Sequence, residues 1–425
     1  MRVEERVYKN FLAILKEELV LAVGCTEPAC LALAGARLRE VLGRVPQRIT
    51  IKLSANLIKN TKSVLIPYSN GLKGMREAVW LGIFGGESRL GLAALSAVPP
   101  EAVERVKAVM DLPERTKVEL LDSPAKLHLI VEGSCGADCA LVEIRDAHSN
   151  FVRLERNGEV LLAQAECGGD GPAPTDRSSL SVQAIVAFAD QVNLEDVEPI
   201  LRPQIEHNSA IAQAGLAGKY GAGVGRSLLE HCGESVGNLA RAQAAAASDA
   251  RMGGADLPVV INSGSGNQGI AASIPVIVYA RHLGLPEERL LRALCVSNLV
   301  AIHQKTGIGR LSAYCGAVSA ACGAGAGIAY LLGGNLEQIS TTITNTLANV
   351  AGIICDGAKA SCAAKIASSV DAAVLALNLS FQATAFPPGD GIVQSSVEET
   401  IDVVRDIAAQ GMRQTDLTVL KHMIR

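Results

Sequence analysis

The hydrophobic period of the chain changes near residue 170, and this change limits the folds available to it. Alternating apolar and polar residues, typical of strands, recur before this point, whereas helical spacing dominates after Ser178. The segment GGDGPAPTD at residues 168–176 has the glycine and proline density of a linker. We therefore predict an α+β N-terminal domain over residues 1–167, with a small mixed or antiparallel sheet. A linker over 168–177 and a mostly α-helical domain over 178–425 complete the prediction.

Local patterns add detail to both halves. RITIKLSANL alternates like a strand, and the last strand-like segment, FVRLERNGEVLLA, contains Asn157-Gly158 between alternating apolar residues. Asn-Gly at such a position is a strong hairpin signal. In the helical half, only LPVVINS is expected to be extended.

Composition excludes several classes of protein. Hydrophobic residues make up 49% of the 425, which is enough for a sizeable core. The net charge is -4 and no basic block is present, so nucleic acid is not expected as a partner. Aromatic residues are only 3% while glycine reaches 41, so packing must rely on small side chains. Helices of this kind suit a tight homodimer.

No segment of the sequence requires a membrane. The first 24 residues fit an amphipathic helix better than a signal peptide. The longest uncharged run, Leu311 to Leu336, could span a bilayer, but its Ala, Gly and Ser content favours a buried helix pair. We expect a cytoplasmic protein without membrane contact, whose eleven cysteines are reduced thiols. This expectation favours metal binding or catalysis over disulfides.

Three cysteines of the last third, Cys315, Cys355 and Cys362, lie in segments built mainly of small residues, with His303, Lys305 and Arg310 nearby. Three thiols are one fewer than usually hold a [4Fe–4S] cluster, so one iron would stay open as a Lewis acid. The seven-residue spacing of the last two suits one helix face, although Asp356-Gly357 between them suggests a turn at a helix start. Buried structural thiols are an equally good interpretation of this pattern.

The segment Gly24-Cys25-Thr26-Glu27-Pro28-Ala29 places a cysteine before a helix that begins with proline. A thiol at a helix N-terminus is expected to be exposed and to have a lowered pKa. Cys25 could then act as a base, a nucleophile or a metal ligand. A turn with a buried cysteine is the alternative.

Two polar segments are candidates for binding a substrate. Asn56, Lys59 and Asn60 follow a predicted strand and could bind a carboxylate, or form a solvated loop. The second segment is a glycine loop before a helix, which suits an anion. It contains Ser263, Ser265, Asn267 and Gln268. Its glycines satisfy G-x-G-x-x-G, but no second parallel strand follows, so we discount a dinucleotide.

Several motifs together resemble the iron–sulfur L-cysteine desulfidase family over essentially the whole chain. These are GCTEPA, SANLIKNTKSVLIPYSNG, INSGSGNQGI, CDGAKASC and GDGIV…VEETI. The second half is also similar to the alpha domain of iron–sulfur L-serine dehydratases, whose last two cluster cysteines are more widely separated. The resemblance implies that Cys315, Cys355 and Cys362 hold a [4Fe–4S] cluster.

The resemblance also implies a reaction. L-Cysteine and water would give pyruvate, ammonia and hydrogen sulfide by β-elimination, without pyridoxal phosphate. The open iron would bind the substrate sulfur and Cys25 would take the Cα proton, or Cys25 would cap the fourth iron in the resting enzyme. Asn56, Lys59, Asn60, Ser263, Ser265, Asn267 and Gln268 are the candidates for holding the substrate.

Three rival hypotheses stay open at this point. L-Serine dehydration uses the same cluster chemistry with a hydroxyl leaving group. A pyridoxal-phosphate β-eliminase would need a lysine imine, for which no local signature exists. A redox or iron-storage module would be expected to have four cysteine ligands instead of three.

Overall fold

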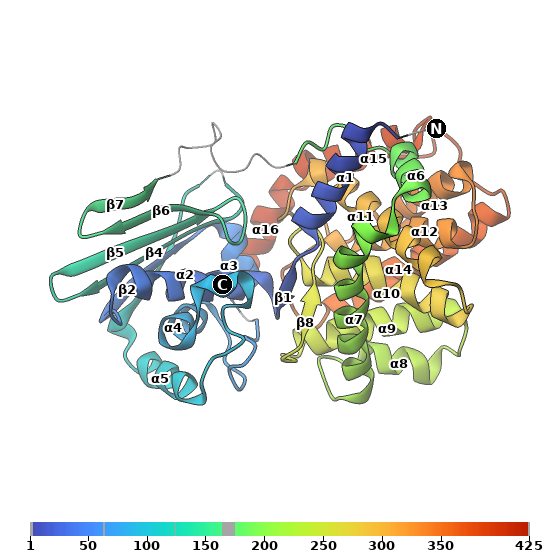
Figure 1. Cartoon of the computed structure of the whole chain (residues 1–425). Helices are drawn as coiled ribbons and strands as arrows, with labels where there is room; N and C mark the ends of the chain where they lie inside the picture. The colour runs from blue at the N-terminus through green and yellow to red at the C-terminus, as the bar shows by residue number, and fades with distance from the viewer. Residues whose placement is uncertain (1–2, 63, 124, 164–174, 424–425) are drawn as a thin grey trace.

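The computed structural model describes residues 3–62, 64–123, 125–163 and 175–423. It contains a sheet with its own helices beside a larger helical body (Figure 1). The predicted class, an α+β N-terminal part followed by a mostly helical part, is confirmed. Most of the predicted linker, 168–177, lies outside the described residues, and the domain boundaries stay a prediction.

The first body is built on a six-stranded sheet in the order β3-β2-β4-β5-β6-β7. β2 and β3 are parallel, and the other neighbouring pairs are antiparallel. The strands are β2 (Arg48–Leu53), β3 (Thr116–Leu120), β4 (His128–Cys135), β5 (Asp138–Arg145), β6 (Phe151–Arg156) and β7 (Glu159–Ala163). Alternate residues of β2, such as Ile49 and Ile51, are buried, as the alternation of this strand predicted.

Helices cover one face of this sheet, with α2 against β4 and β5 and α4 packed on α2 (Figure 1). The helices of this body are α2 (Thr26–Leu42), α3 (Ala55–Thr61), α4 (Met75–Gly85) and α5 (Pro100–Met110), with 3₁₀ turns at Ser88–Ala93 and Pro113–Arg115. The predicted hairpin is confirmed between β6 and β7. Asn157 and Gly158 have φ values of 51° and 84°, as a type I′ turn requires.

The helical body surrounds α12 (Gly316–Leu331), which packs against α10, α11, α13 and α14. Its other elements are α6 (Val182–Gln191), α7 (Leu194–Ala217), α8 (Val224–His231), α9 (Val236–Met252), α10 (Gly266–His282), α11 (Glu287–Ile308), α13 (Leu336–Val350), α14 (Cys362–Phe381), α15 (Val397–Asp406), a π turn at Ile407–Gly411 and α16 (Arg413–Met423). The uncharged run therefore forms one buried helix and not the expected pair, because α12 ends before Leu332 and α13 begins only at Leu336.

One described helix, α14, is long and apolar enough to cross a membrane, and half of its most apolar window is buried within the fold. Core helices of soluble proteins pass the same test, so this feature is weak evidence for a membrane span.

The first and last helices each pack on the body that lies farther along or farther back in the chain. The predicted N-terminal amphipathic helix is α1 (Glu5–Glu18), and it packs on α7 and α11 of the helical body. Next, β1 (Leu21–Val23) pairs antiparallel with β8 (Pro258–Val260), the short extended segment expected in the second half. At the other end, α16 packs against α3. These contacts bring the GCTEPA segment next to the cysteine-bearing loops.

Candidate active site

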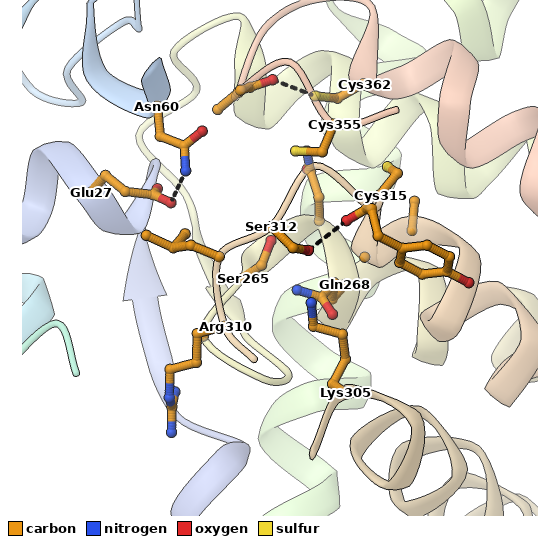
Figure 2. Close-up of a pocket in the computed structure, with 18 of the residues that line it drawn as sticks. Glu27, Asn60, Ser265, Gln268, Lys305, Arg310, Ser312, Cys315, Cys355 and Cys362 are labelled. Carbon is orange, nitrogen blue, oxygen red and sulfur yellow. Dashed lines mark hydrogen bonds between the residues drawn. The ribbon is translucent and has the colours of Figure 1, made fainter. Parts of the chain in front are cut away.

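A cavity of about 90 Å³ lies where the two bodies meet, and it gathers most of the predicted site (Figure 2). All three cysteines of the trio line it, together with polar residues from both bodies. Of the predicted substrate-binding residues, the lining includes Asn60, Ser265, Asn267 and Gln268.

A short backbone bridge brings Cys315 next to Cys355 across forty residues of sequence. Tyr314 pairs with Ile354 in an isolated antiparallel bridge. The Cys315 N–H donates to the Ile353 carbonyl at 3.0 Å, and the Cys355 N–H donates to the Ala313 carbonyl at 2.6 Å. The sequence between these segments forms α12 and α13, so the two thiols meet only when the helical body is folded.

Cys362 is the first residue of α14, and Cys355 lies in the preceding loop. The turn at a helix start, one of the two predicted arrangements, is therefore the observed one. Gly357 makes this turn with φ of 94°, and a Cβ there would lie 2.6 Å from the Lys59 carbonyl oxygen. A glycine is thus required where the loop passes α3.

Four helices begin at this site. Cys315 is the N-cap of α12, Cys362 starts α14, Ser265 is the N-cap of α10, and Cys25 is the N-cap of α2. Helix N-termini carry partial positive charge and unpaired N–H groups, which favour anions. The four N-termini therefore favour a bound anion at this site.

Lys305, from the last turn of α11, brings a buried positive charge to the cavity. It is only 4% exposed, and burial lowers its pKa from 10.5 to about 8, against the opposing effect of the Cys355 thiol. No hydrogen bond or ion pair of its side chain is found within the described part of the chain. Arg310, which also lines the cavity, instead donates to Glu18 at 3.2 Å.

Glu27, from the first turn of α2, lines the cavity opposite Lys305 (Figure 2). Asn60 Nδ2 donates to its Oε1 at 3.1 Å, and the Thr26 hydroxyl lies 3.1 Å from its Oε2. His148 Nε2 is 4.0 Å from Oε1, and burial lowers the pKa of this histidine. The sequence prediction missed Glu27 as a site residue, although it belongs to the GCTEPA motif.

Gln268 reaches the cavity because its neighbour is a glycine. A Cβ on Gly316 would lie 2.4 Å from the Gln268 side-chain amide carbon. The Gln268 Oε1 atom is buried and accepts no hydrogen bond from the described residues. The Asn60 Oδ1 atom is also buried and accepts no hydrogen bond from the described residues. Two amide oxygens could therefore accept hydrogen bonds from a ligand in the cavity.

The exposure and the pKa of Cys25 differ from those that the sequence predicted. It is 1% exposed, and burial raises its pKa to about 12, although the nearby Arg251 favours the thiolate. The expected exposed thiol with a lowered pKa is therefore wrong, because the desolvation of Cys25 outweighs its place at a helix N-terminus. Cys25 packs in a small cluster with Cys362, one layer behind the lining residues.

Three predicted substrate-binding residues lie outside the lining of this cavity. Lys59 forms a 2.5 Å ion pair with Asp416 of α16. Asn56 is half-buried on α3. Ser263 donates to Asn262 Oδ1 at 2.8 Å and borders a second cavity.

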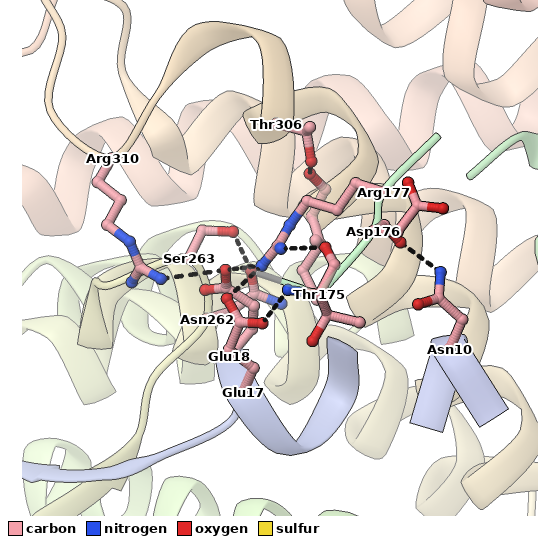
Figure 3. A network of polar contacts seen from close by, with 11 residues as sticks. Asn10, Glu17, Glu18, Thr175, Asp176, Arg177, Asn262, Ser263, Thr306 and Arg310 are labelled. Atoms are coloured by element: carbon pink, nitrogen blue, oxygen red, sulfur yellow. Dashed lines mark hydrogen bonds and ion pairs between the residues drawn. The ribbon is translucent and has the colours of Figure 1, made fainter. Parts of the chain in front are cut away.

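The second cavity, of about 400 Å³, adjoins the first, because Lys305 and Arg310 line both. Figure 3 shows its polar network, in which Arg177 bridges Glu17 at 2.7 Å and Glu18 at 2.5 Å. Glu18 is shared with Arg310, so the guanidinium of Arg310 is held on the side of the second cavity.

The donor set of the first cavity fits an iron–sulfur cluster. Thiols are the usual protein ligands of such clusters. Among the residues that the structure describes, no three His, Cys, Asp or Glu side chains are placed to bind one metal ion together. The thiols surround a cavity instead of converging on a point, which suits a cofactor with several metal atoms. Burial raises the pKa of Cys315 to about 12 and also raises that of Cys362, so these thiols must lose protons on binding iron.

Comparison with known proteins indicates the class of enzyme to which this thiol-lined pocket belongs. Residues 89–421 match the model of the serine dehydratase alpha chain family. The chain therefore belongs to the serine dehydratase alpha chain family, whose members are iron–sulfur-dependent lyases.

Full-length relatives carry no activity in their names. A UPF0597 protein of Lachnoclostridium phytofermentans is 50% identical over 418 residues, 98% of this chain and 100% of that protein. A UPF0597 protein of Desulfitobacterium hafniense is 46% identical over 424 residues, 100% of this chain and 98% of that protein. One of Treponema denticola is 44% identical over 431 residues and covers 100% of both chains.

Proposed function

We propose that this protein is a [4Fe–4S]-dependent L-cysteine desulfidase, which converts L-cysteine and water to pyruvate, ammonia and hydrogen sulfide. The observation that carries the proposal is the meeting of Cys315, Cys355 and Cys362 around one cavity. The cavity also contains a buried lysine that has no ion-pair partner among the described residues. Three thiolates would hold the cluster. When bound, such a cluster supplies an open iron, which acts as a Lewis acid toward a soft leaving group.

The protein's own residues would hold the substrate next to this position. Lys305 and the N-termini of α10 and α12 favour a carboxylate at one side of the cavity. Gln268 and Asn60 offer amide oxygens that lack a donor within the described chain. The walls of the small cavity would exclude most water from the reacting atoms.

Cys25 remains our candidate for the group that takes the Cα proton. Its place behind Cys362 and near Arg251 supports a role at this site. Because its pKa is about 12, the thiol is protonated in the described form. The role therefore requires that Cys25 lose its proton when the site is loaded, with Arg251 and the α2 N-terminus stabilising the thiolate.

L-Serine dehydration is the second candidate, and the observation that favours it is the family match to a serine dehydratase chain. The two functions differ in the leaving group. A single anaerobic preparation with a complete cluster should be assayed for sulfide and pyruvate from L-cysteine, and for pyruvate from L-serine.

We expect equimolar sulfide and pyruvate from L-cysteine, with a kcat/KM well above that for L-serine. A higher kcat/KM for L-serine would replace the desulfidase proposal by the dehydratase. No turnover of either amino acid by cluster-loaded protein would overturn both.

A further inference from the structure

Two opposite charges face the same cavity, and within the described residues neither has a permanently charged partner. Lys305 and Glu27 are 4% and 8% exposed, and both line the cavity of the cysteine trio. Figure 2 shows Lys305 with Gln268 at one side, Glu27 with Asn60 at another, and the three cysteines at a third. The cavity thus has a cationic, an anionic and a thiol wall.

Lys305 differs from the other cations of this region. Lys59 is paired with Asp416, and Arg310 with Glu18, while Arg251 Nε donates to the Gly24 carbonyl at 3.0 Å. The side chain of Lys305 makes no such contact with the described residues. A buried ammonium without a partner is unfavourable, so this charge is expected to meet an anion from outside the chain.

Glu27 is held in place but not neutralised. Asn60 and Thr26 fix its two oxygens with neutral groups. Its ion-pair partner in the described chain is His148, at 4.0 Å, and burial lowers the pKa of this histidine toward the neutral form. The carboxylate therefore offers its charge to a cation in the cavity.

We propose that Lys305 binds the α-carboxylate and Glu27 the α-ammonium of a small L-α-amino acid, so that the substrate side chain points to the three cysteines. This assignment rests on the proposed function for its substrate class. Three different walls fix three different substituents of Cα, so the cavity also selects one enantiomer. Lys305 and Glu27 are specificity-determining residues in this account.

The test is a binding cycle between two variants and three ligands. Lys305→Met and Glu27→Gln remove one charge each with little change in size. The ligands are L-cysteine, cysteamine (which lacks the carboxylate) and 3-mercaptopropionate (which lacks the amine), titrated calorimetrically into anaerobic protein. Every protein in the cycle, the wild-type reference included, also carries Cys25→Ala, so that the heat reports binding without turnover. Lys126→Met is the control, since Lys126 is an exposed lysine near Lys305 that does not line the cavity.

The wild type should prefer L-cysteine about 10- to 100-fold over either analogue, the factor expected for one charge-assisted contact. Lys305→Met should lose the preference over cysteamine and keep the preference over 3-mercaptopropionate. Glu27→Gln should do the reverse, and Lys126→Met should behave as the wild type. Iron content and thermal unfolding would be measured in parallel.

Equal weakening of all three ligands by Lys305→Met would overturn the assignment and show that this lysine balances the charge of the thiol site instead. Unchanged preferences in both variants would also overturn it. The cycle measures binding and not turnover, and it can be repeated with L-serine, ethanolamine and 3-hydroxypropionate. A failed desulfidase assay with an intact binding cycle therefore separates the proposed function from this inference.

Discussion

The ion pair between Lys59 and Asp416 should contribute strongly to the docking of the C-terminal helix. The two charged atoms are 2.5 Å apart, and the side chains are 1% and 16% exposed. Removing one partner of a buried pair leaves an unpaired buried charge, which costs about 3–5 kcal/mol. Because Asp416 retains some contact with water, we expect Asp416→Ala to lower the free energy of unfolding by about 3 kcal/mol.

The chain offers a matched exposed pair as control. Lys9 and Glu5 are 2.6 Å apart, but their side chains are 72% and 81% exposed. Glu5→Ala should therefore lower the free energy of unfolding far less than Asp416→Ala does. A double variant, Lys59→Met with Asp416→Leu, should recover most of the loss, because two apolar side chains leave no buried charge.

Urea unfolding followed by circular dichroism would measure these differences, with the slope of the transition compared among variants. KM should also rise in Asp416→Ala, because Lys59 precedes Asn60, which lines the cavity and bonds to Glu27. If Asp416→Ala were no less stable than Glu5→Ala, or if the double variant were as unstable as the single one, the reasoning would be refuted.

Three further predictions concern single positions. Gly316→Ala should displace Gln268, since the new Cβ would lie 2.4 Å from its amide carbon, and should lower kcat/KM at least about tenfold in a steady-state assay; unchanged kinetics would contradict this. Cys25→Ala should keep its iron and lose turnover, and normal turnover would show that Cys25 does not take the proton. Burial raises the pKa of Cys295 from 9.0 to about 12. The protonated thiol therefore adds its full contribution to the free energy of unfolding below pH 9, and this contribution is lost as the pH rises toward 12. Between pH 9 and 12 the free energy of unfolding should therefore fall less steeply with pH in Cys295→Ala than in the wild type, by about 1.4 kcal/mol per pH unit. Urea titrations at several pH values would measure this, and equal slopes would contradict the raised pKa of Cys295.

Local sequence predicted the parts of the fold that depend on neighbours in the chain. The turn at Asn157-Gly158 needs two residues that tolerate positive φ, and no distant contact is required to form it. The alternation in β2 likewise marks its buried face without knowledge of its partners β3 and β4. The prediction of a helix pair in the long uncharged run was wrong, because a run of small residues does not show where one helix ends.

The site depends on contacts between residues that are far apart in the sequence, so only part of it could be predicted. Cys315 and Cys355 could be joined only through family resemblance, because a bridge between residues 314 and 354 has no local signal. The ion pair of Lys59 was hidden for the same reason, since Asp416 lies 357 positions away. Glu27 has the signal of a first-turn acid, which ordinarily indicates a helix-dipole interaction and not a cavity wall. Burial, which sets the pKa of Cys25, is likewise a property of the assembled fold.

The most direct test of the central claim is the iron and acid-labile sulfide content of anaerobically reconstituted protein, compared among the wild type, Cys355→Ala and Cys139→Ala. Cys139 is an exposed cysteine of β5 and serves as the control. The account predicts about four irons per chain in the wild type and in Cys139→Ala, and a large loss in Cys355→Ala. Equal iron in all three proteins, or none in the wild type, would contradict the claim that these thiols hold a cluster.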